Sequence, residues 1–214
     1  MVIVTVRTWQ LNRLNYAEFA RISEEEYWPL FDKHGCRALG IWGVRVGAAE
    51  RLMVMTRYDS LDHWLGTRAW GDAADKLKAI SDKRDSMILD TDLIALDTLS
   101  HRQPQRDAPE TEPGVYAWET FRVERQNRER FRELTEDQWL PQTESSGGIR
   151  LVGMWNGYIG PQNLVYMLTR ADSVSALEQR HALGGDQSHA LEQRAAISER
   201  TSVQLLYAVT KRRP

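Results

Sequence analysis

Arg57, Tyr58 and His63 stand close together in the sequence and carry side chains that could act on a small organic molecule. A guanidinium group can hold a carboxylate or an enolate through two parallel hydrogen bonds. An imidazole titrates near neutral pH and can serve as a general base, and a tyrosine hydroxyl can orient a phenolic substrate. We therefore take Arg57, Tyr58 and His63 as the candidate catalytic residues.

Each of these residues also has a purely structural interpretation. Arg57 precedes Asp59 and can pair with it, and the same spacing recurs at Arg170 and Asp172. A single histidine is more often a surface residue than a catalyst, and no two histidines have the spacing of metal ligands. The chain has no glycine-rich phosphate loop, nucleophile elbow or paired-acid motif. These patterns predict no metal site and no cofactor, and they leave open whether the chain is an enzyme.

The chain contains eight tryptophans, a high number for 214 residues. Aromatic walls are typical of a pocket for a flat apolar ligand, but aromatic side chains also fill cores and interfaces between sheets. We take four of them as candidate ligand-binding residues, namely Trp9, Trp42, Trp64 and Trp70. A core role is favoured for Trp42, which recurs as Trp155. Trp64 and Trp70 have no such counterpart, which favours a pocket in the first half of the chain.

The sequence repeats itself at an offset of about 112 residues. Trp9 is matched by Phe121 and Pro29 by Pro141, and further along Trp42 is matched by Trp155. A repeat of about a hundred residues has the size of a small domain. We therefore predict a first domain at residues 1–100, a linker rich in proline and charge at 101–113, and a second domain at 114–214. The informative positions are those where the repeat fails: Arg7 against Glu119, Tyr58 against Ala171, and Trp64 against Leu177.

Each copy is predicted to follow the order β-α-β-β-α-β of the ferredoxin-like fold. Expected strands of the first copy cover residues 2–9, 38–46, 51–58 and 91–99, with a helix capped by Asn15 and kinked or ended by Pro29. A match of residues 79–81 to 196–198 predicts an insertion near residues 184–186 of the second copy. The fold class is thus α+β, with tandem ferredoxin-like repeats whose open sheet faces pack together as in a dimeric α/β-barrel. The linker is long enough for this pairing to occur within one chain or between chains.

Composition limits the partners. The apolar fraction of 42%, the charged fraction of 27% and the net charge of −2 are those of an ordinary globular protein. They give no electrostatic footprint for nucleic acid, and no apolar run approaches the roughly 20 residues of a membrane span. Cys36 is the single cysteine, which excludes a disulfide framework. We expect a cytoplasmic protein with a small-molecule ligand and no nucleic-acid or membrane partner. The sequence leaves open whether the protein forms a homo-oligomer.

The first copy resembles the NIPSNAP family of the dimeric α/β-barrel superfamily. The segments that carry the resemblance are Arg7-Thr8-Trp9, Leu39-Gly40-Ile41-Trp42, Arg57-Tyr58-Asp59-Ser60-Leu61 and Arg68-Ala69. The second copy carries it more weakly, with Glu119 in place of Arg7 and Ala171 in place of Tyr58. The resemblance implies a ferredoxin-like fold, barrel pairing and a pocket between sheet and helices. The wider superfamily includes cofactor-free monooxygenases of polyketide aromatics, haem-dependent enzymes, isomerases and domains without a known reaction, so the fold does not select among them.

Two hypotheses of function follow. The first is a small-molecule enzyme, a cofactor-independent oxygenase or isomerase, with its pocket in one or both repeats. The second is a non-catalytic ligand-binding or assembly module that uses the barrel as a scaffold. A pocket that is open in the first copy and filled in the second would favour the first hypothesis, and two filled pockets would exclude it.

Overall fold

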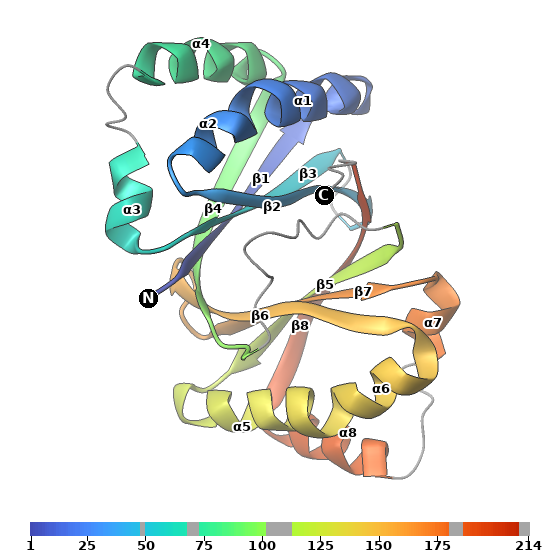
Figure 1. Cartoon of the computed structure of the whole chain (residues 1–214). Helices are drawn as coiled ribbons and strands as arrows, with labels where there is room; N and C mark the ends of the chain where they lie inside the picture. The colour runs from blue at the N-terminus through green and yellow to red at the C-terminus, as the bar shows by residue number, and fades with distance from the viewer. Residues whose placement is uncertain (48–49, 68–72, 102–112, 180–185, 210–214) are drawn as a thin grey trace.

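Eight antiparallel strands close into a barrel with helices packed on its outside (Figure 1). The structure, a computed structural model, describes residues 1–47, 50–67, 73–101, 113–179 and 186–209. The strands follow the order β1-β3-β2-β8-β5-β7-β6-β4 around the barrel. Because β2 pairs with β8 and β4 with β6, the two halves of the chain close one barrel within a single chain. Closure leaves no strand with an unpaired edge in this sheet.

In the first half, the strands alternate with helices in the predicted order. The elements are β1 (Ile3–Leu11), η1 (Arg13–Asn15), α1 (Tyr16–Ile22), η2 (Ser23–Tyr27), α2 (Trp28–Lys33), β2 (Arg37–Val46), β3 (Arg51–Tyr58), α3 (Leu61–Gly66), α4 (Ala73–Asp85) and β4 (Ile88–Thr98). Strand β3 has the predicted bounds, whereas β4 begins three residues earlier than predicted. The turn between β2 and β3 includes residues 48–49, which lie outside the described residues.

The second half follows the same order. Its elements are β5 (Val115–Val123), η4 (Arg125–Asn127), α5 (Arg128–Glu133), η5 (Leu134–Trp139), α6 (Leu140–Gly147), β6 (Ile149–Ile159), β7 (Leu164–Ala171), α7 (Val174–Gln179), α8 (Asp186–Ala196) and β8 (Ser198–Ala208). Figure 1 shows the helices of the two halves at opposite ends of the molecule, with the strands between them. Each half thus contributes four strands and one outer layer of helices.

Both long helices contain a wide π turn directly before a proline. Pro29 and Pro141 lie in the first turn of α2 and α6, where a missing backbone N–H costs little. One turn earlier, the Ser23 and Thr135 hydroxyls donate to the carbonyl oxygens of Phe19 and Phe131, each at 2.7 Å. Such bonds to the preceding turn bend a helix. The predicted kink at Pro29 is therefore a π turn that lets the helix continue.

Two details of the sequence prediction are wrong. Asn15 makes no capping hydrogen bond, because it already has helical backbone angles; Asn12 caps instead, and accepts from the Leu14 N–H at 2.9 Å. The second half also has no insertion before its last strand. Strand β4 starts at Ile88 and β8 at Ser198, an offset of 110. The second copy is thus slightly shorter here, and the match of residues 79–81 to 196–198 was a chance resemblance between a helix and a strand start.

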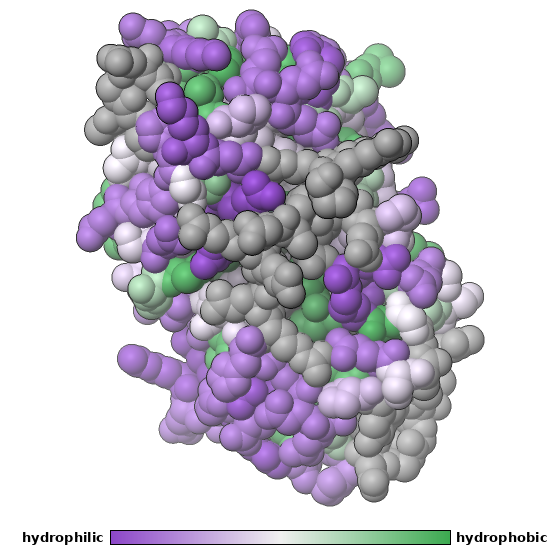
Figure 2. Space-filling view, viewed as in Figure 1, coloured by the Kyte–Doolittle hydropathy of each residue, from purple (hydrophilic) through white to green (hydrophobic). Residues whose placement is uncertain are grey.

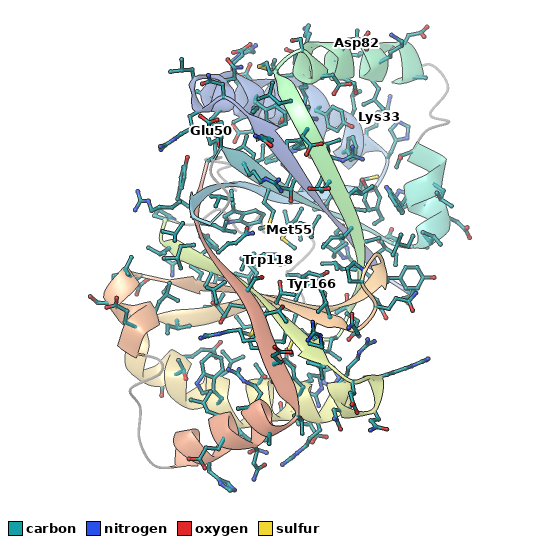
Figure 3. The ribbon with its side chains drawn as sticks, turned by 180° about the vertical axis from the view of Figure 1, so that it is seen from behind. Lys33, Glu50, Met55, Asp82, Trp118 and Tyr166 are labelled. Atoms are coloured by element: carbon teal, nitrogen blue, oxygen red, sulfur yellow. The ribbon has the colours of Figure 1, made fainter. Side chains whose placement is uncertain are left out.

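The barrel interior is filled by apolar side chains from both halves. One hydrophobic cluster includes Trp42, Met55 and Tyr116 together with Trp155 and Leu206. Figure 3 shows Met55, Trp118 and Tyr166 in the space between the two sets of strands. The Trp118 and Tyr166 rings stack with centroids 5.5 Å apart. Side chains on alternate positions of each strand point the other way, toward the helices.

The outer helical surfaces are largely hydrophilic on the face shown in Figure 2, most clearly over α5. Ion pairs cover these surfaces; Arg21, for example, lies 2.7 Å from Glu18 and 2.8 Å from Glu25. Among the described residues, no helix is both long and apolar enough to pass through a membrane. The apolar side chains are instead used inside the barrel and between sheet and helices.

Candidate functional site

A cavity of about 270 Å³ lies between the sheet and the helices of the first half. Strands β1 and β3 form its floor, because alternate residues of each strand face the helices. The side chains of Thr5, Arg7 and Trp9 come from β1, and those of Thr56 and Tyr58 from β3. Helices η2, α2, α3 and α4 supply the remaining walls. Its volume is close to the lower end of the range of small-molecule sites.

Aromatic rings form most of the cavity wall. Six aromatic side chains line it, namely Trp9, Tyr27, Trp28, Phe31, Tyr58 and Trp64. The Tyr27 and Phe31 rings stack at 4.4 Å, and Phe31 meets Tyr58 edge-on at 6.5 Å. The Trp64 ring lies 6.4 Å from that of Tyr58. Such walls suit a flat, unsaturated ligand.

Arg84, at the end of α4, is the most deeply buried cation of the cavity. Its side chain is only 5% exposed, and its guanidinium carbon lies 4.4 to 4.5 Å from the ring centroids of Trp9, Phe19 and Tyr27. The Nε atom is buried without a hydrogen-bond partner. Burial lowers the pKa of Arg84 to about 10, which still leaves the group charged at neutral pH. Arg84 is thus a buried cation held mainly by aromatic rings.

Arg7 is the second cation of the cavity. It is partly buried, and its guanidinium carbon lies 5.7 Å from the Trp9 ring centroid. Its charge is close enough to Arg84 to lower the pKa of that residue. In the described part of the chain, no ion pair joins either arginine to a carboxylate. Tyr27 and Asp85 act in the opposite direction on the pKa of Arg84. Asp85 lines the cavity but is exposed to solvent, so the inner part of the cavity carries the two guanidinium groups.

Tyr58 lies inside the cavity, as a candidate catalytic residue should. Its side chain is 5% exposed, and it lies beside Thr5 and Thr56 in the cavity wall. Burial raises the pKa of the Tyr58 hydroxyl well above its usual range, with smaller contributions from Cys36 and Tyr27. The hydroxyl consequently stays protonated at neutral pH. It can donate a hydrogen bond to a ligand oxygen, but it is a poor base.

The structure places His63 behind the cavity wall rather than in it. The Ser60 hydroxyl caps α3 by accepting from the His63 N–H at 3.0 Å. The ring Nδ1 accepts from the Asp59 N–H at 3.2 Å, and Nε2 lies 2.8 Å from the His34 carbonyl oxygen. Because the carbonyl can only accept, these partners fit a neutral ring with its proton on Nε2. His63 thus ties α3 to the loop before β2.

Cys36 is expected to resist thiol reagents in the folded protein. It is 1% exposed and lies 3.4 Å from His63 Nε2, and burial raises its pKa to about 12. The thiolate is the reactive form, so less than a hundredth of the thiol is ionised at pH 8. We expect Ellman's reagent to give no colour within minutes at pH 8, and full reaction of one thiol in 6 M guanidinium chloride. Rapid reaction of the folded protein would contradict this burial.

The other predicted site residues lie away from the cavity. Arg57 alternates with Thr56 and Tyr58 and so faces the opposite side of the sheet, with Nη1 3.8 Å from the Asp59 carboxylate. Trp42 is fully buried inside the barrel, where its ring meets that of Tyr116. Trp70 lies outside the described residues. Of the predicted set, the structure brings Tyr58, Trp9 and Trp64 together at the cavity.

In the part of the second half that the structure describes, side chains occupy many of the equivalent positions. The strand registers place Glu119 at the position of Arg7. Arg7 lies opposite Val54 on β3 and Leu93 on β4. Glu119 lies opposite Met167 on β7 and Val203 on β8, the equivalent strands of the second half. Seven counterparts of cavity residues are buried members of two hydrophobic clusters, namely Ala117, Phe121, Trp139, Leu140, Met167, Ala171 and Leu177. Two other cavities, one beside Arg128 and one beside Arg170, lie away from these positions. Among the described residues, the helix–sheet interface is therefore open in the first copy and occupied by buried side chains at these seven positions in the second.

Arg84 and Tyr27 are cavity residues that sequence reasoning missed. The match at an offset of 117 hid the correspondence between Arg84 and Arg194, which the structure places at an offset of 110. Arg194 covers Phe121, Phe131 and Trp139 just as Arg84 covers their three counterparts. A search that allowed the offset to shorten would have found an arginine retained on the inner face of the last helix.

Other ligand chemistries find less support in the described residues. No three His, Cys, Asp or Glu side chains are grouped there so that they could hold a metal ion. Neither His34 nor His63 lines the cavity, and the His63 ring contacts backbone atoms and Cys36. The groups that line the cavity are aromatic rings, hydroxyls, two guanidinium ions, the exposed Asp85 carboxylate and a few aliphatic side chains.

Comparison with solved structures supports this barrel architecture. The chain superimposes on a candidate monooxygenase from Lactobacillus acidophilus NCFM with a TM-score of 0.67 and 13% identity, covering 98% of this chain and 94% of that one. A candidate monooxygenase from Fusobacterium nucleatum gives 0.67 and 12%, with 98% and 93% covered. An anthrone oxidase-like protein gives 0.64 and 10%, with 98% and 92% covered. At these identities the likeness concerns the fold.

Comparison with sequence families gives a match for the half of the chain that contains the cavity. Curated proteins provide no match to this sequence. The sequence model of the NIPSNAP family matches residues 4–100, which span β1 to the end of β4 and hold all the residues that line the cavity. The mixed α/β fold and the closed barrel agree with that match. Residues 4–100 of this chain thus carry the match to the NIPSNAP family.

Proposed function

We propose that the chain is a small-molecule enzyme, a cofactor-independent oxygenase or isomerase, that works in the cavity of its first half. The observation that carries the proposal is the difference between the described residues of the halves: the interface is open, aromatic and cationic in the first copy, whereas buried apolar side chains stand at seven of the equivalent positions in the second. A purely structural duplicate has no need of such a cavity. Likeness of fold to candidate monooxygenases adds support.

The same difference bears on how the chain is organised. Element order and strand register recur in the two halves, which supports tandem ferredoxin-like repeats at residues 1–100 and 114–214 with a connection at 101–113. In this proposal the first repeat is the active one and the second completes the barrel. Strand β8 of the second repeat pairs with β2, and β6 pairs with β4, so the first repeat has both sheet edges covered.

Oxygenation and isomerisation share a first step that the cavity could support. A flat ketone or phenol loses a proton from an acidic carbon or hydroxyl, and its oxygen becomes negatively charged. The Tyr58 hydroxyl is held neutral by burial and can donate a hydrogen bond to that oxygen. Asp85, an exposed carboxylate at the cavity, can accept the proton and pass it to water. The anion then takes up dioxygen or a proton at another atom.

Anthrone is a suitable test substrate because it is flat, has an acidic CH₂ group and reacts with dioxygen to give anthraquinone and water. We expect the protein to accelerate oxygen uptake, with one anthraquinone formed per O₂. Loss of the Tyr58 hydroxyl in Tyr58→Phe should slow the reaction by roughly 10²-fold. Glu133→Gln, an exposed change on α5, serves as control. An oxygen electrode and the absorbance of anthraquinone measure both quantities.

The alternative function, a non-catalytic ligand-binding or assembly module, is favoured by one observation. His63, the expected base, uses both ring nitrogens in contacts to the backbone. Binding of anthrone without accelerated oxygen uptake would support a binding module and contradict the oxygenase. Absence of both binding and turnover would contradict the first-half site for this class of ligand.

A further inference from the structure

We propose that the ligand of the first-half cavity is a flat aromatic carboxylate, whose carboxylate group sits against Arg7 and Arg84. This inference rests on the proposed function only in using the same cavity, and it names a substrate class that a general small-molecule enzyme does not require. Arg7 and Arg84 share this cavity, and neither forms an ion pair with a carboxylate among the described residues.

Two guanidinium groups close together in a partly desolvated space are unfavourable by themselves. Burial already lowers the pKa of Arg84, and the neighbouring charge of Arg7 adds to this effect. A buried cation without an anionic partner is normally removed or compensated during evolution, because desolvation is costly. Arg84 also has a buried Nε with no hydrogen-bond acceptor. A bound anion would satisfy both the charge and the free donor.

The second half shows what replaces the ligand when no cavity is needed. Arg194 lies over three aromatic rings, as Arg84 does. At the position of Arg7, however, stands Glu119, whose carboxylate is buried and whose Oε1 lies 3.5 Å from Nη1 of Arg200. The packed half therefore contains its own carboxylate where the open half has a second cation. In the first half, Asp85 at the cavity is exposed to solvent, and a ligand carboxylate would supply the negative group at the inner end.

The shape of the cavity selects the rest of the ligand. Trp9, Tyr27 and Phe31 line the same cavity as the arginines, and Trp64 comes from α3. A guanidinium binds a carboxylate through paired hydrogen bonds, while aromatic walls hold a planar ring. An aliphatic acid would leave these walls uncovered. A neutral aromatic compound would leave both cations without a partner.

A matched pair of probes tests the charge alone. 2-Naphthoate and 2-naphthamide have nearly the same shape, and only the first is an anion at pH 7. By isothermal titration calorimetry, we expect naphthoate to bind at least about tenfold more tightly, the ratio that corresponds to one charge-assisted hydrogen bond. Arg7→Gln should remove most of this preference, and Arg7→Glu, which copies the second half, should abolish naphthoate binding. Arg122→Gln, an exposed change on β5, should leave both affinities unchanged.

Arg84→Met tests the buried cation, but it also removes contacts to three aromatic rings and can reduce folding. The affinities of the Arg7 variants for the two probes therefore decide whether the anion site exists. Equal affinity for the two probes, or an unchanged preference in Arg7→Gln, would overturn the proposal. The wild-type protein could bind the two probes equally, with Trp64→Ala weakening the binding of both to the same extent. The cavity would then bind aromatic ligands, and only the proposed anion site would be wrong. Failure of both probes to bind the wild-type protein would overturn this proposal and leave anthrone oxidation to decide the enzyme on its own.

Discussion

Replacement of Trp42 by alanine is expected to lower the free energy of unfolding by about 4 kcal/mol, the loss typical of a large aromatic residue removed from a core. Trp42 has no solvent exposure, and its ring centroid lies 5.8 Å from that of Tyr116 in the other half. The cavity left by the mutation would open inside the barrel, where both halves contribute to one cluster. Urea unfolding followed by circular dichroism gives the change.

Trp64→Ala is the matched control for this prediction. Trp64 is partly exposed and lines the first-half cavity, so we expect it to cost about 1 kcal/mol of stability. Its effect should appear instead as weaker binding of aromatic probes. Equal losses of stability in the two variants would contradict the assignment of Trp42 to the core and Trp64 to the ligand site.

Glu119→Gln is expected to destabilise the protein by about 2 kcal/mol, since it removes a buried carboxylate and leaves the partly exposed Arg200 without that counterion. Glu119 is 1% exposed, and Arg200 lies 3.5 Å away. The counterpart change in the first half, Arg7→Gln, should alter stability by less than about 0.5 kcal/mol, because Arg7 has no carboxylate partner in the described chain. Thermal and urea unfolding of both variants provide the measurement.

An exposed ion pair serves as the reference for the loss of stability expected in Glu119→Gln. Glu133 lies 3.2 Å from Arg130 on the surface of α5, and both side chains are more than two-fifths exposed. Glu133→Gln should therefore cost less than about 1 kcal/mol. A Glu119→Gln variant as stable as Glu133→Gln would show that the buried carboxylate is not the counterion of the second half.

Much of the fold could be predicted because its signals are local. Strand β3 contains the apolar run Leu52–Met55 and ends at the Asp59-Ser60 cap, and its bounds were predicted correctly. The barrel closure depends on pairs between distant strands, such as β2 with β8, for which the sequence contains no local signal. The cap at Asn12 was missed because a short 3₁₀ turn precedes the α-helix there.

The candidate site was harder to predict because it depends on which face each residue presents. Tyr58 and Arg57 are adjacent in sequence, yet alternation along β3 sends one into the cavity and the other to the opposite side. His63 has the right chemistry for a base, but its ring is used to hold a loop. The failed matches of the repeat were the better guide: Arg7, Tyr58 and Trp64 all line the cavity. Arg84 escaped because it is retained in both halves as Arg194.

The central claim is that the first half binds a ligand where the second half is packed. A crystal soaked with 6-bromo-2-naphthoate tests it directly, because bromine is located by its anomalous scattering without bias from the fitted chain. We predict one bromine site per chain, in the cavity lined by Trp9, Trp64 and Arg84, with the carboxylate toward Arg7. A bromine site between the sheet and helices of the second half, or an empty cavity in the first, would contradict the account.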